Sequence, residues 1–462
     1  MKNGEGRWFR RRTSMETDLN RSPLDPLGPA RTSGGTAPSS SRGKLTGKDL
    51  TRRIRSTALA FRGYDVANLG RSRELLEHPE YGPVVAKVLA EASEISSAAL
   101  GVGIDLAAHV RAGEKTALAT FPHDVAAIVA METAQLRLLE QFFHVPIHDV
   151  RLSFGYSIGE LSALIFSGVF SLAELLPIPL LLAPDCAELA EDTTLGVLFT
   201  RKGPELHPED VERLCTAISG EGQGLIGPSA YLSPNTALLL AQGRTLDRVE
   251  ALMREYLPEK VMLRRNPNKW PPLHSPLVWQ RLIPNRAAVA LYKIAGNPAP
   301  PSPQVLSAVT GEASYDGLNT RDLLVRWTDH PQRLWDVIDR TLAEGVETVI
   351  HVGPGPSLIA ATFSRLGNNV SRYVGYGNKY LNLLGRGLAS GLSHYAWLSR
   401  RLPSKTNLLR APYLHHVALE DWLLEQQPVA HHAVFAVSAN GRASAEASAE
   451  EDSARLTSPE SV

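Results

Sequence analysis

The residues best suited to chemistry form the segment Gly155-Tyr156-Ser157-Ile158-Gly159. Its pattern, G-x-S-x-G, places a serine nucleophile on a tight turn when a strand precedes it and a helix follows it. The two glycines leave room for close backbone approach, so that the Oγ atom of Ser157 is exposed. The N–H of Ile158 can then donate to a negatively charged oxygen that develops during a reaction. The alternative is a glycine-containing turn whose serine only caps a helix.

A serine nucleophile needs a base that removes its proton, and histidine is the most frequent one. The chain has 14 histidines. His274, in the sequence W-P-P-L-H-S-P-L, His330 and His351 lie near predicted elements that could border the site. The adjacent pairs at 415–416 and 431–432 are more typical of surface histidines. The residues alone therefore leave three candidates for the base.

The elements that must position these residues alternate between strands and helices. Apolar segments predict strands at 57–61, 150–154, 305–309, 348–352 and 373–376. Apolar residues at helical spacing predict helices at 124–143, 160–167 and 331–344. This alternation predicts an α/β fold with a largely parallel sheet, in which Ser157 lies between a strand and the next helix.

One block in the middle of the chain follows a different order. It predicts strands at 196–200, 225–232, 236–241 and 260–264, with helices at 207–219 and 245–256. The resulting order, β-α-β-β-α-β, is typical of a ferredoxin-like unit. We therefore predict a small subdomain inserted into the α/β core.

Changes in composition divide the chain into six predicted parts. Residues 31–41 read R-T-S-G-G-T-A-P-S-S-S, which is linker composition, and the residues after 436 are rich in Ser, Ala and Glu. The predicted parts are a disordered tail (1–48), the first part of the core (49–195), the insert (196–266), the second part of the core (267–390), a C-terminal helical extension (391–435) and a disordered tail (436–462).

The composition excludes several classes of protein. Lys and Arg number 48, as do Asp and Glu, so the net charge is zero and the chain lacks the basic footprint of a nucleic-acid-binding protein. Two cysteines, Cys186 and Cys215, are too few for a disulfide framework or a cysteine-rich zinc site, and they suit a reducing, cytoplasmic setting. No apolar run reaches the ~20 residues that a membrane span requires.

Three motifs, in this order, resemble one enzyme family. Residues 155–170 (G-Y-S-I-G-E-L-S-A-L-I-F-S-G-V-F) are similar to the nucleophile segment of malonyl-CoA:acyl carrier protein transacylases and polyketide synthase acyltransferase domains. Residues 274–277 (H-S-P-L) resemble the segment of that family that carries its catalytic histidine. Residues 352–356 (V-G-P-G-P) resemble a turn of the family. The resemblance covers about residues 57–380 and includes the position of the ferredoxin-like insert.

The resemblance implies an acyltransferase fold and a two-step exchange. Ser157 would attack an acyl-CoA thioester, and the acyl group would then pass from the serine to the thiol of an acyl carrier protein. His274 would be the general base and acid, and the N–H of Ile158 one oxyanion donor. The implied partners are an acyl-CoA and an acyl carrier protein, and neither a metal nor a bound cofactor is expected.

The chain departs from the family at positions near the substrate. Tyr64 stands where the family has a glutamine that backs the oxyanion hole, so it is the candidate second member of that hole. Tyr156 replaces the histidine before the serine, and Phe121 replaces the glutamine of a T-Q-P segment. These two residues are predicted to contact the substrate.

The most informative departure concerns an arginine that binds the free carboxylate in malonyl-specific members. The alignment puts Ala183 or a neighbour at its position, and no Arg or Lys occurs between Arg151 and Arg201. Arg333 is a weaker candidate for a replacement cation. Since a buried carboxylate without a partner is costly, the pocket predicts an uncharged acyl group or an altered carboxylate site.

Two other functions remain open at this stage. A serine thioesterase or esterase could use the same Ser157–His274 pair with water as the acceptor, and a degenerate acyltransferase could act as a non-catalytic partner in a fatty-acid or polyketide assembly. Arg264, Arg265 and Lys269 could contact the phosphates of CoA or an acidic carrier protein, or form an ordinary solvated strand end.

Overall fold

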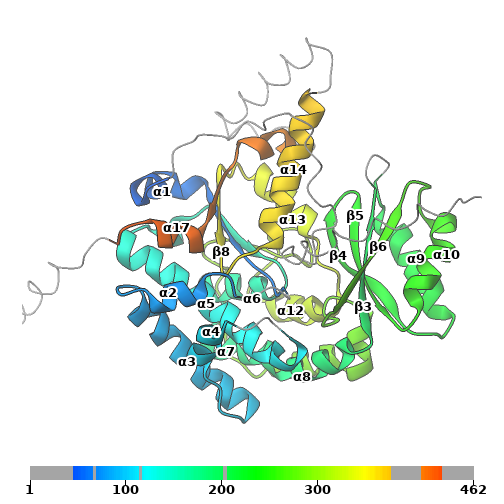
Figure 1. The fold of residues 1–462 in the computed structure, drawn as a ribbon, viewed down its shortest axis with the longest axis horizontal. Coiled ribbons are helices and arrows are strands. Elements are labelled where there is room, and N and C mark those ends of the chain that lie inside the picture. Colours follow the sequence, from blue (N-terminus) through cyan, green and yellow to red (C-terminus); the bar gives the residue numbers. More distant parts are fainter. Residues whose placement is uncertain (1–44, 66–68, 114–116, 201–204, 376–406, 429–462) are drawn as a thin grey trace, which may run out of the picture.

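A parallel sheet forms the centre of the larger unit of the molecule. The computed structural model describes residues 45–65, 69–113, 117–200, 205–375 and 407–428 (Figure 1). Its core sheet contains β1 (Thr57–Phe61), β2 (Leu152–Gly155), β7 (Val305–Leu306), β8 (Thr348–Val352) and β9 (His415–Ala418). The strand order is β7-β2-β1-β8-β9, and every neighbouring pair is parallel. This arrangement confirms the predicted α/β class.

Helices cover both faces of this sheet. They are α1 (Gly47–Arg53), α2 (Ser72–Glu77), α3 (Gly82–Leu100), α4 (Leu106–Ala112), α5 (Phe121–Phe143), α6 (Ile158–Phe166), α7 (Leu172–Leu175), α8 (Pro177–Ala190), α11 (Ile283–Leu291), α12 (Thr320–Asp329), α13 (Leu334–Ala343), α14 (Leu358–Gly375) and α17 (Leu419–Glu425). A 3₁₀ segment, η4 (Pro276–Arg281), follows His274.

The alternation of β1 explains how both faces become buried. Leu59 and Phe61 join the cluster that includes the apolar faces of α3, α5 and α8. Ala58 and Ala60 point to the opposite face and join the cluster that includes α13 and α14. Because both faces are covered, β1 reads as a continuous apolar run, which is why its bounds could be predicted from the sequence.

The smaller unit is the antiparallel subdomain drawn in green in Figure 1. It comprises β3 (Thr193–Phe199), α9 (Pro208–Gly220), β4 (Ile226–Ser233), β5 (Thr236–Gln242), α10 (Thr245–Tyr256) and β6 (Met262–Lys269). Its strand order, β4-β5-β3-β6, and the element order β-α-β-β-α-β confirm the ferredoxin-like prediction. The strands extend three residues beyond the predicted range 196–266 at each end.

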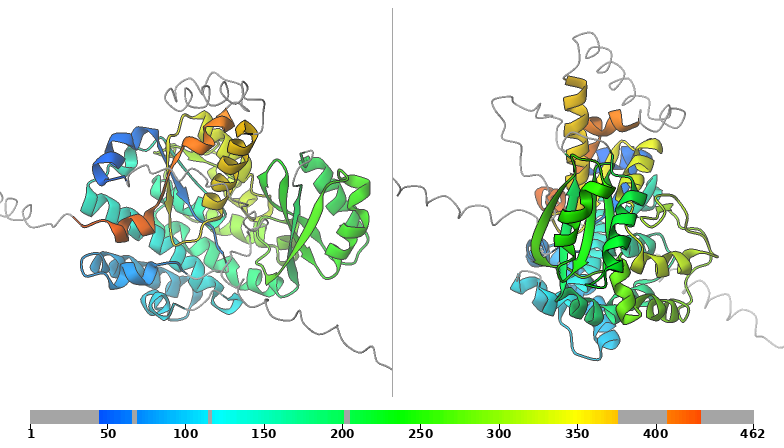
Figure 2. Two further views of the ribbon diagram at one scale, coloured as in Figure 1. Left: turned by 45° about the horizontal axis from the view of Figure 1, so that its top comes forward. Right: turned by 90° about the vertical axis from the view of Figure 1, so that its right-hand side faces the viewer.

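The subdomain sheet separates its own helices from the core. Leu239, Ala237 and Leu198 pack with α9 and α10 on the outer face. Leu238, Leu240 and their neighbours on β3 and β4 belong to the same cluster as α13. The two outer helices therefore lie on the side away from the core, as Figures 1 and 2 show.

The later part of the chain differs from the prediction in two places among its described residues. The predicted strand at 373–376 falls, over its described residues, at the end of α14. The predicted helical extension at 391–435 supplies a core strand, β9, between a 3₁₀ segment (Leu408–Tyr413) and α17. The helix α1 also begins inside the segment 1–48 that was predicted to be disordered. Residues 1–44, 376–406 and 429–462, and the tail predicted at 436–462, lie outside the described residues.

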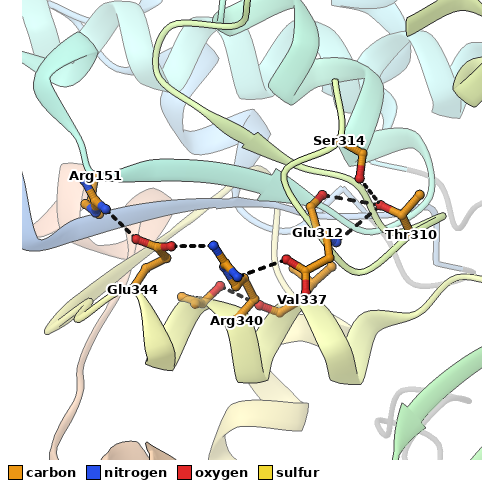
Figure 3. Close-up of polar contacts among 8 residues, drawn as sticks. Arg151, Thr310, Glu312, Ser314, Val337, Arg340 and Glu344 are labelled. Atoms are coloured by element: carbon orange, nitrogen blue, oxygen red, sulfur yellow. Dashed lines mark hydrogen bonds and ion pairs between the residues drawn. The ribbon is translucent and has the colours of Figure 1, made fainter. Parts of the chain in front are cut away.

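A chain of ion pairs connects α13 with the loop after β7 (Figure 3). Arg340 binds Glu312 at 3.1 Å and Glu344 at 2.9 Å, and Glu344 also contacts Arg151, which precedes β2. Thr310 extends this network: its hydroxyl donates to the backbone carbonyl oxygen of Glu312, and its Oγ1 atom lies 2.6 Å from Ser314 Oγ. These contacts hold the loop 307–315 from the solvent side.

None of the helices in the described ranges is long and apolar enough to cross a membrane.

Candidate active site

Ser157 occupies a strained turn between β2 and α6. Its backbone angles, φ 55° and ψ −122°, are rare for a residue with a side chain. The turn is tight: a Cβ atom on Gly155 would lie 2.0 Å from the carbonyl carbon of Gly159, and one on Gly159 would lie 2.3 Å from the Phe61 carbonyl oxygen. Both motif glycines are therefore required by close backbone approach, as the sequence predicted.

His274 is the histidine that meets the serine. Its Nε2 atom lies 2.7 Å from Ser157 Oγ, and its Nδ1 atom lies 2.6 Å from the backbone carbonyl oxygen of Trp327. Since a carbonyl can only accept, Nδ1 carries the proton and Nε2 is free to accept from the serine hydroxyl. A backbone carbonyl thus fills the orienting role that a carboxylate has in the Ser-His-Asp triad.

Trp327, at the C-terminal end of α12, contacts both members of this pair. Its indole Nε1–H donates to the backbone carbonyl oxygen of Ser157 at 3.1 Å. Its ring packs edge-on against the His274 imidazole, with 4.9 Å between centroids. The backbone N–H of His274 also donates to the carbonyl oxygen of Thr328 at 2.7 Å. One short segment of α12 therefore fixes the distance between the serine and the histidine.

Gln332 holds the serine from another side. Its Oε1 atom accepts from the backbone N–H of Ser157 at 3.2 Å, and its own backbone bridges to β4 of the subdomain. The N–H of Tyr231 donates to the Gln332 carbonyl at 2.8 Å. The position of Ser157 is thus tied to the seam between the core and the subdomain.

A largely apolar pocket of about 540 Å³, counted with its open mouth, surrounds the pair. The residues that line it are Tyr64, Phe121, Val125, Tyr156, Ser157, Ile158, Pro179, Ser229, Trp270, Pro271, Leu273, His274 and Trp327. They come from core elements (the ends of β1 and β2, and α5, α6, α8 and α12), from β4 of the subdomain, which contributes Ser229, and from the segment after β6. The pocket therefore lies where the core and the subdomain meet.

Burial controls the charge of the groups around this pocket. It lowers the pKa of His274 to about 4, although the hydrogen bond to the Trp327 carbonyl acts in the opposite direction and raises this pKa. Burial, together with the charge of Asp65, raises the pKa of the Tyr156 phenol above its ordinary value. At neutral pH the imidazole is therefore uncharged, which is the form that accepts a proton.

Four of the other predicted site residues lie in this pocket. Ile158 is the first residue of α6, so its backbone N–H has no acceptor within the helix and lies beside the nucleophile. Tyr64, Phe121 and Tyr156 form parts of the wall. Arg333 is not among the residues that line the pocket, and its Nε atom binds Asp336 Oδ2 at 2.6 Å.

The other candidate bases have different partners. His330 pairs with Asp329 at 2.6 Å, and His351 lies 3.0 Å from His416 Nδ1 on the neighbouring strand. Neither contacts Ser157. Arg265, one of the predicted phosphate contacts, pairs with Asp247 and Glu250, while Lys269 directly precedes the pocket residue Trp270.

Sequence reasoning missed three residues of the site. Trp327 and Gln332 stand 170 and 175 positions from Ser157, and no local motif marks either of them. Trp270 stands in the quoted W-P-P-L-H segment, and an aromatic residue four positions before the histidine was the available signal. Among the described residues, no group of three or more His, Cys, Asp or Glu side chains could hold a metal ion.

Comparison with curated proteins finds acyltransferases. The chain is 27% identical over 285 residues to the malonyl CoA-acyl carrier protein transacylase of Escherichia coli O157:H7, which covers 61% of this chain and 84% of that protein. It is 26% identical over 316 residues to polyketide synthase GfsA of Streptomyces halstedii, which covers 66% of this chain and 4% of the synthase. The chain is therefore similar, at low identity, to proteins named malonyl CoA-acyl carrier protein transacylase. No family model matches it.

Solved structures of such transacylases share the fold. FabD from Acinetobacter baumannii matches with a TM-score of 0.55 and 22% identity, over 68% of this chain and 91% of that one. The malonyl-transacylase in a complex with the holo acyl carrier protein of a type II polyketide synthase matches with a TM-score of 0.52 and 23% identity, over 66% and 91%. These likenesses confirm the predicted acyltransferase core with its inserted subdomain.

Proposed function

We propose that this chain is an acyl-CoA:acyl carrier protein S-acyltransferase that works through an acyl-Ser157 intermediate. The observation that carries the proposal is the 2.7 Å contact between Ser157 Oγ and a neutral His274 at the wall of an apolar pocket. The curated relatives, named malonyl CoA-acyl carrier protein transacylases, support the reaction class and the two thioester partners.

In the first half-reaction Ser157 takes the acyl group from CoA. His274 Nε2 accepts the hydroxyl proton as Oγ attacks the carbonyl carbon of the thioester. The C–S bond then breaks, and the imidazolium returns its proton to the departing sulfur. The products are the acyl-serine ester and free CoA thiol.

The second half-reaction reverses these roles with a new thiol. The phosphopantetheine thiol of the carrier protein gives its proton to His274, and its sulfur attacks the ester carbonyl carbon. The C–O bond breaks, and His274 protonates Ser157 Oγ. Each step forms an imidazolium, which the Trp327 carbonyl stabilises because it accepts the Nδ1–H.

Each tetrahedral intermediate carries a negative oxygen, and the N–H of Ile158 at the start of α6 is the proposed donor to it. Tyr64 is the proposed location of a second donor, because it lines the pocket at the end of the neighbouring strand β1. This chemistry needs neither a metal nor a resident cofactor. We also assign the reaction to the cytoplasm, in keeping with the two buried free thiols.

Intact-protein mass spectrometry tests this function. The protein is mixed with a panel of acyl-CoA thioesters, and the acyl adduct is then challenged with a holo carrier protein. We expect an adduct of acyl mass that the carrier protein removes, and no adduct in Ser157→Ala. Transfer activity retained in full by Ser157→Ala would contradict the proposed nucleophile.

The same experiment separates the alternatives. Release of CoA without transfer to the carrier protein would replace the transferase with a thioesterase. The absence of both adduct and CoA release with every thioester would favour the non-catalytic partner. The circular dichroism spectrum of Ser157→Ala serves as the control for folding.

A further inference from the structure

The wall of the active-site pocket is built from rings and aliphatic groups. Tyr64 packs edge-on against Phe121, with 4.8 Å between ring centroids, and against Trp270 at 5.9 Å. Val125, Pro179 and Leu273 line the same pocket as these aromatic residues. Phe121 is 3% exposed and Tyr64 is 8% exposed, while Trp270 and Leu273 are half-buried, so the aromatic wall is largely shielded from water at Phe121 and Tyr64.

No cationic side chain lines this pocket in the described part of the chain. The helix α8, the third helix after Ser157, contributes Pro179 to the lining. Further along α8, Leu182 and Ala183 are buried and apolar. Arg286, which reaches α8, pairs with Asp185 and donates to the Leu181 carbonyl at 3.0 Å. The polar lining groups that could approach an acyl chain carry no formal positive charge at neutral pH.

A carboxylate in this pocket would lose water and gain no counter-charge. Moving such an ion into a poorly solvated site costs several kcal/mol when it is not paired. Burial has the same effect on two groups of the site. It lowers the pKa of His274 and raises the pKa of Tyr156, and both changes favour the uncharged side chain. An apolar chain faces no such cost and gains about 25 cal/mol for each Å² of surface that it buries.

We propose that this enzyme carries an uncharged acyl group with an apolar chain, such as an acetyl to octanoyl group, and discriminates against dicarboxylic groups such as malonyl. The inference rests on the acyl transfer proposed above and names the substrate class of that same site. Tyr64, Phe121 and Trp270 are the specificity-determining residues.

Acylation rates of the wild-type protein test the inference directly. Acetyl-, butyryl-, octanoyl-, malonyl- and methylmalonyl-CoA are compared by the rate of CoA release and by adduct mass. We expect kcat/KM for the best uncharged thioester to exceed that for malonyl-CoA at least about 100-fold, which corresponds to about 2.7 kcal/mol. Malonyl-CoA reacting as fast as the best uncharged thioester would overturn the inference and leave the transferase function standing.

Placing a cation in the pocket tests the reason for the discrimination. Pro179→Arg adds a guanidinium at the wall, and Pro179→Met is the matched control because it adds a flexible side chain without charge. We expect the malonyl-to-butyryl ratio of kcat/KM to rise at least about tenfold in Pro179→Arg and to stay within about threefold in Pro179→Met. An unchanged ratio in a folded arginine variant would contradict the assignment of this wall to the acyl chain.

If the Pro179 variants fail to fold, a second pair of variants on α5 replaces them. Phe121→Arg adds the cation and Phe121→Leu is its control, and the malonyl-to-butyryl ratio of kcat/KM is compared in the same way. The absence of reaction with every thioester in wild-type protein is the outcome that removes the transferase function itself. The two failures are therefore distinguishable, since each outcome that overturns the inference, malonyl-CoA reacting as fast as the best uncharged thioester or an unchanged ratio in a folded arginine variant, still requires acyl transfer to occur.

Discussion

At the scale of single residues, the site depends on a histidine that is kept neutral by its surroundings. His274 is buried, donates from Nδ1 to a carbonyl, and accepts at Nε2 from Ser157. The Trp327 carbonyl orients the ring and raises the pKa of the imidazole, but it carries no formal negative charge and burial outweighs it. If His274 is the base, as we propose, it therefore remains available in mildly acidic conditions.

This arrangement predicts the pH dependence of acylation. Because the free enzyme needs neutral His274 and the pKa of that group is lowered to about 4, log(kcat/KM) should stay flat from pH 8 to about pH 5. Below about pH 4 it should fall with a slope of one. Stopped-flow measurement of CoA release between pH 3.5 and 8 checks this.

Circular dichroism at each pH is the control, because protonation also acts on stability. The unfolded chain binds protons on this histidine near pH 6.5 and the folded chain only near pH 4, so stability decreases as pH falls through that interval. A kinetic inflection at pH 6.5 to 7 in protein that remains folded would contradict the neutral, buried base.

The sequence was sufficient for part of this site. Ser157 and Gly155 belong to one local turn, and His274 follows from a resemblance. Trp327 and Gln332 could not be found from the sequence. Their contacts with Ser157 arise only when α12, and the segment that joins the subdomain, pack against the turn between β2 and α6. A tryptophan in a helical segment carries no sign of whether it packs in the core or clamps a nucleophile.

At the scale of elements, the nucleophile helix is anchored to the loop after β7. Glu160, in the first turn of α6, is buried and accepts from the backbone N–H of Ala308 at 2.9 Å and from the Tyr315 hydroxyl at 2.5 Å. Burial raises the pKa of its carboxyl to about 7. The network in Figure 3 holds the same loop from outside, through Arg340 and Glu312.

Replacing Glu160 should separate hydrogen bonding from charge. Glu160→Ala leaves two buried donors without an acceptor and should lower the free energy of unfolding by about 2 kcal/mol or more. Glu160→Gln keeps an acceptor oxygen and should stay within about 1 kcal/mol of wild type at pH 5. Urea unfolding followed by fluorescence measures both.

The Gln variant also has an expected pH dependence. The Glu160 carboxyl has a pKa of about 7 in the folded protein and 4.5 in the unfolded chain. The free energy of unfolding of the wild-type protein therefore decreases as the pH rises through that interval. Glu160→Gln has no such group, so its stability relative to wild type should increase from pH 5 to pH 8. A difference that is constant with pH would show that this carboxyl is not buried in the way described.

The element boundaries show where local patterns are sufficient. The strand at 57–61 and the strand at 348–352 were predicted with their observed bounds, because both are fully buried apolar runs. The apolar and aromatic residues at 373–376 resemble a strand, yet α14 continues through Gly375. β9 was missed because only Val417 of its four residues is buried, so its sequence shows no apolar run. The strand forms through its parallel pairing with β8.

At the scale of the whole molecule, the C-terminal segment is part of the core. α17 packs beside α5, where Trp422 meets Phe143 with 4.7 Å between ring centroids. The indole N–H of Trp422 donates to the carbonyl oxygen of Leu45 at 2.7 Å, which joins the last described helix to the first described residue. Glu420 accepts from the N–H of Gly355 at 3.0 Å and so reaches the turn after β8.

Truncating this tryptophan should therefore destabilise the core. Trp422→Ala is expected to lower the free energy of unfolding by about 3 kcal/mol, the usual cost of removing a buried large aromatic side chain. Trp422→Phe keeps a ring against Phe143 and loses only the hydrogen bond, so it should cost about 1 kcal/mol. An unchanged urea midpoint in Trp422→Ala would mean that the C-terminal segment does not contribute to core stability.

The order of strands in the core sheet also bears on how this chain folds as it leaves the ribosome. The central strand β1 is made early, but its neighbours β2 and β8 lie about a hundred and three hundred residues later, and β9 comes later still. The six elements of the subdomain are contiguous between Thr193 and Lys269, so they can pair as soon as they emerge. All elements of the subdomain are thus translated while β1 still has an open edge, and that edge closes only when β8 is translated.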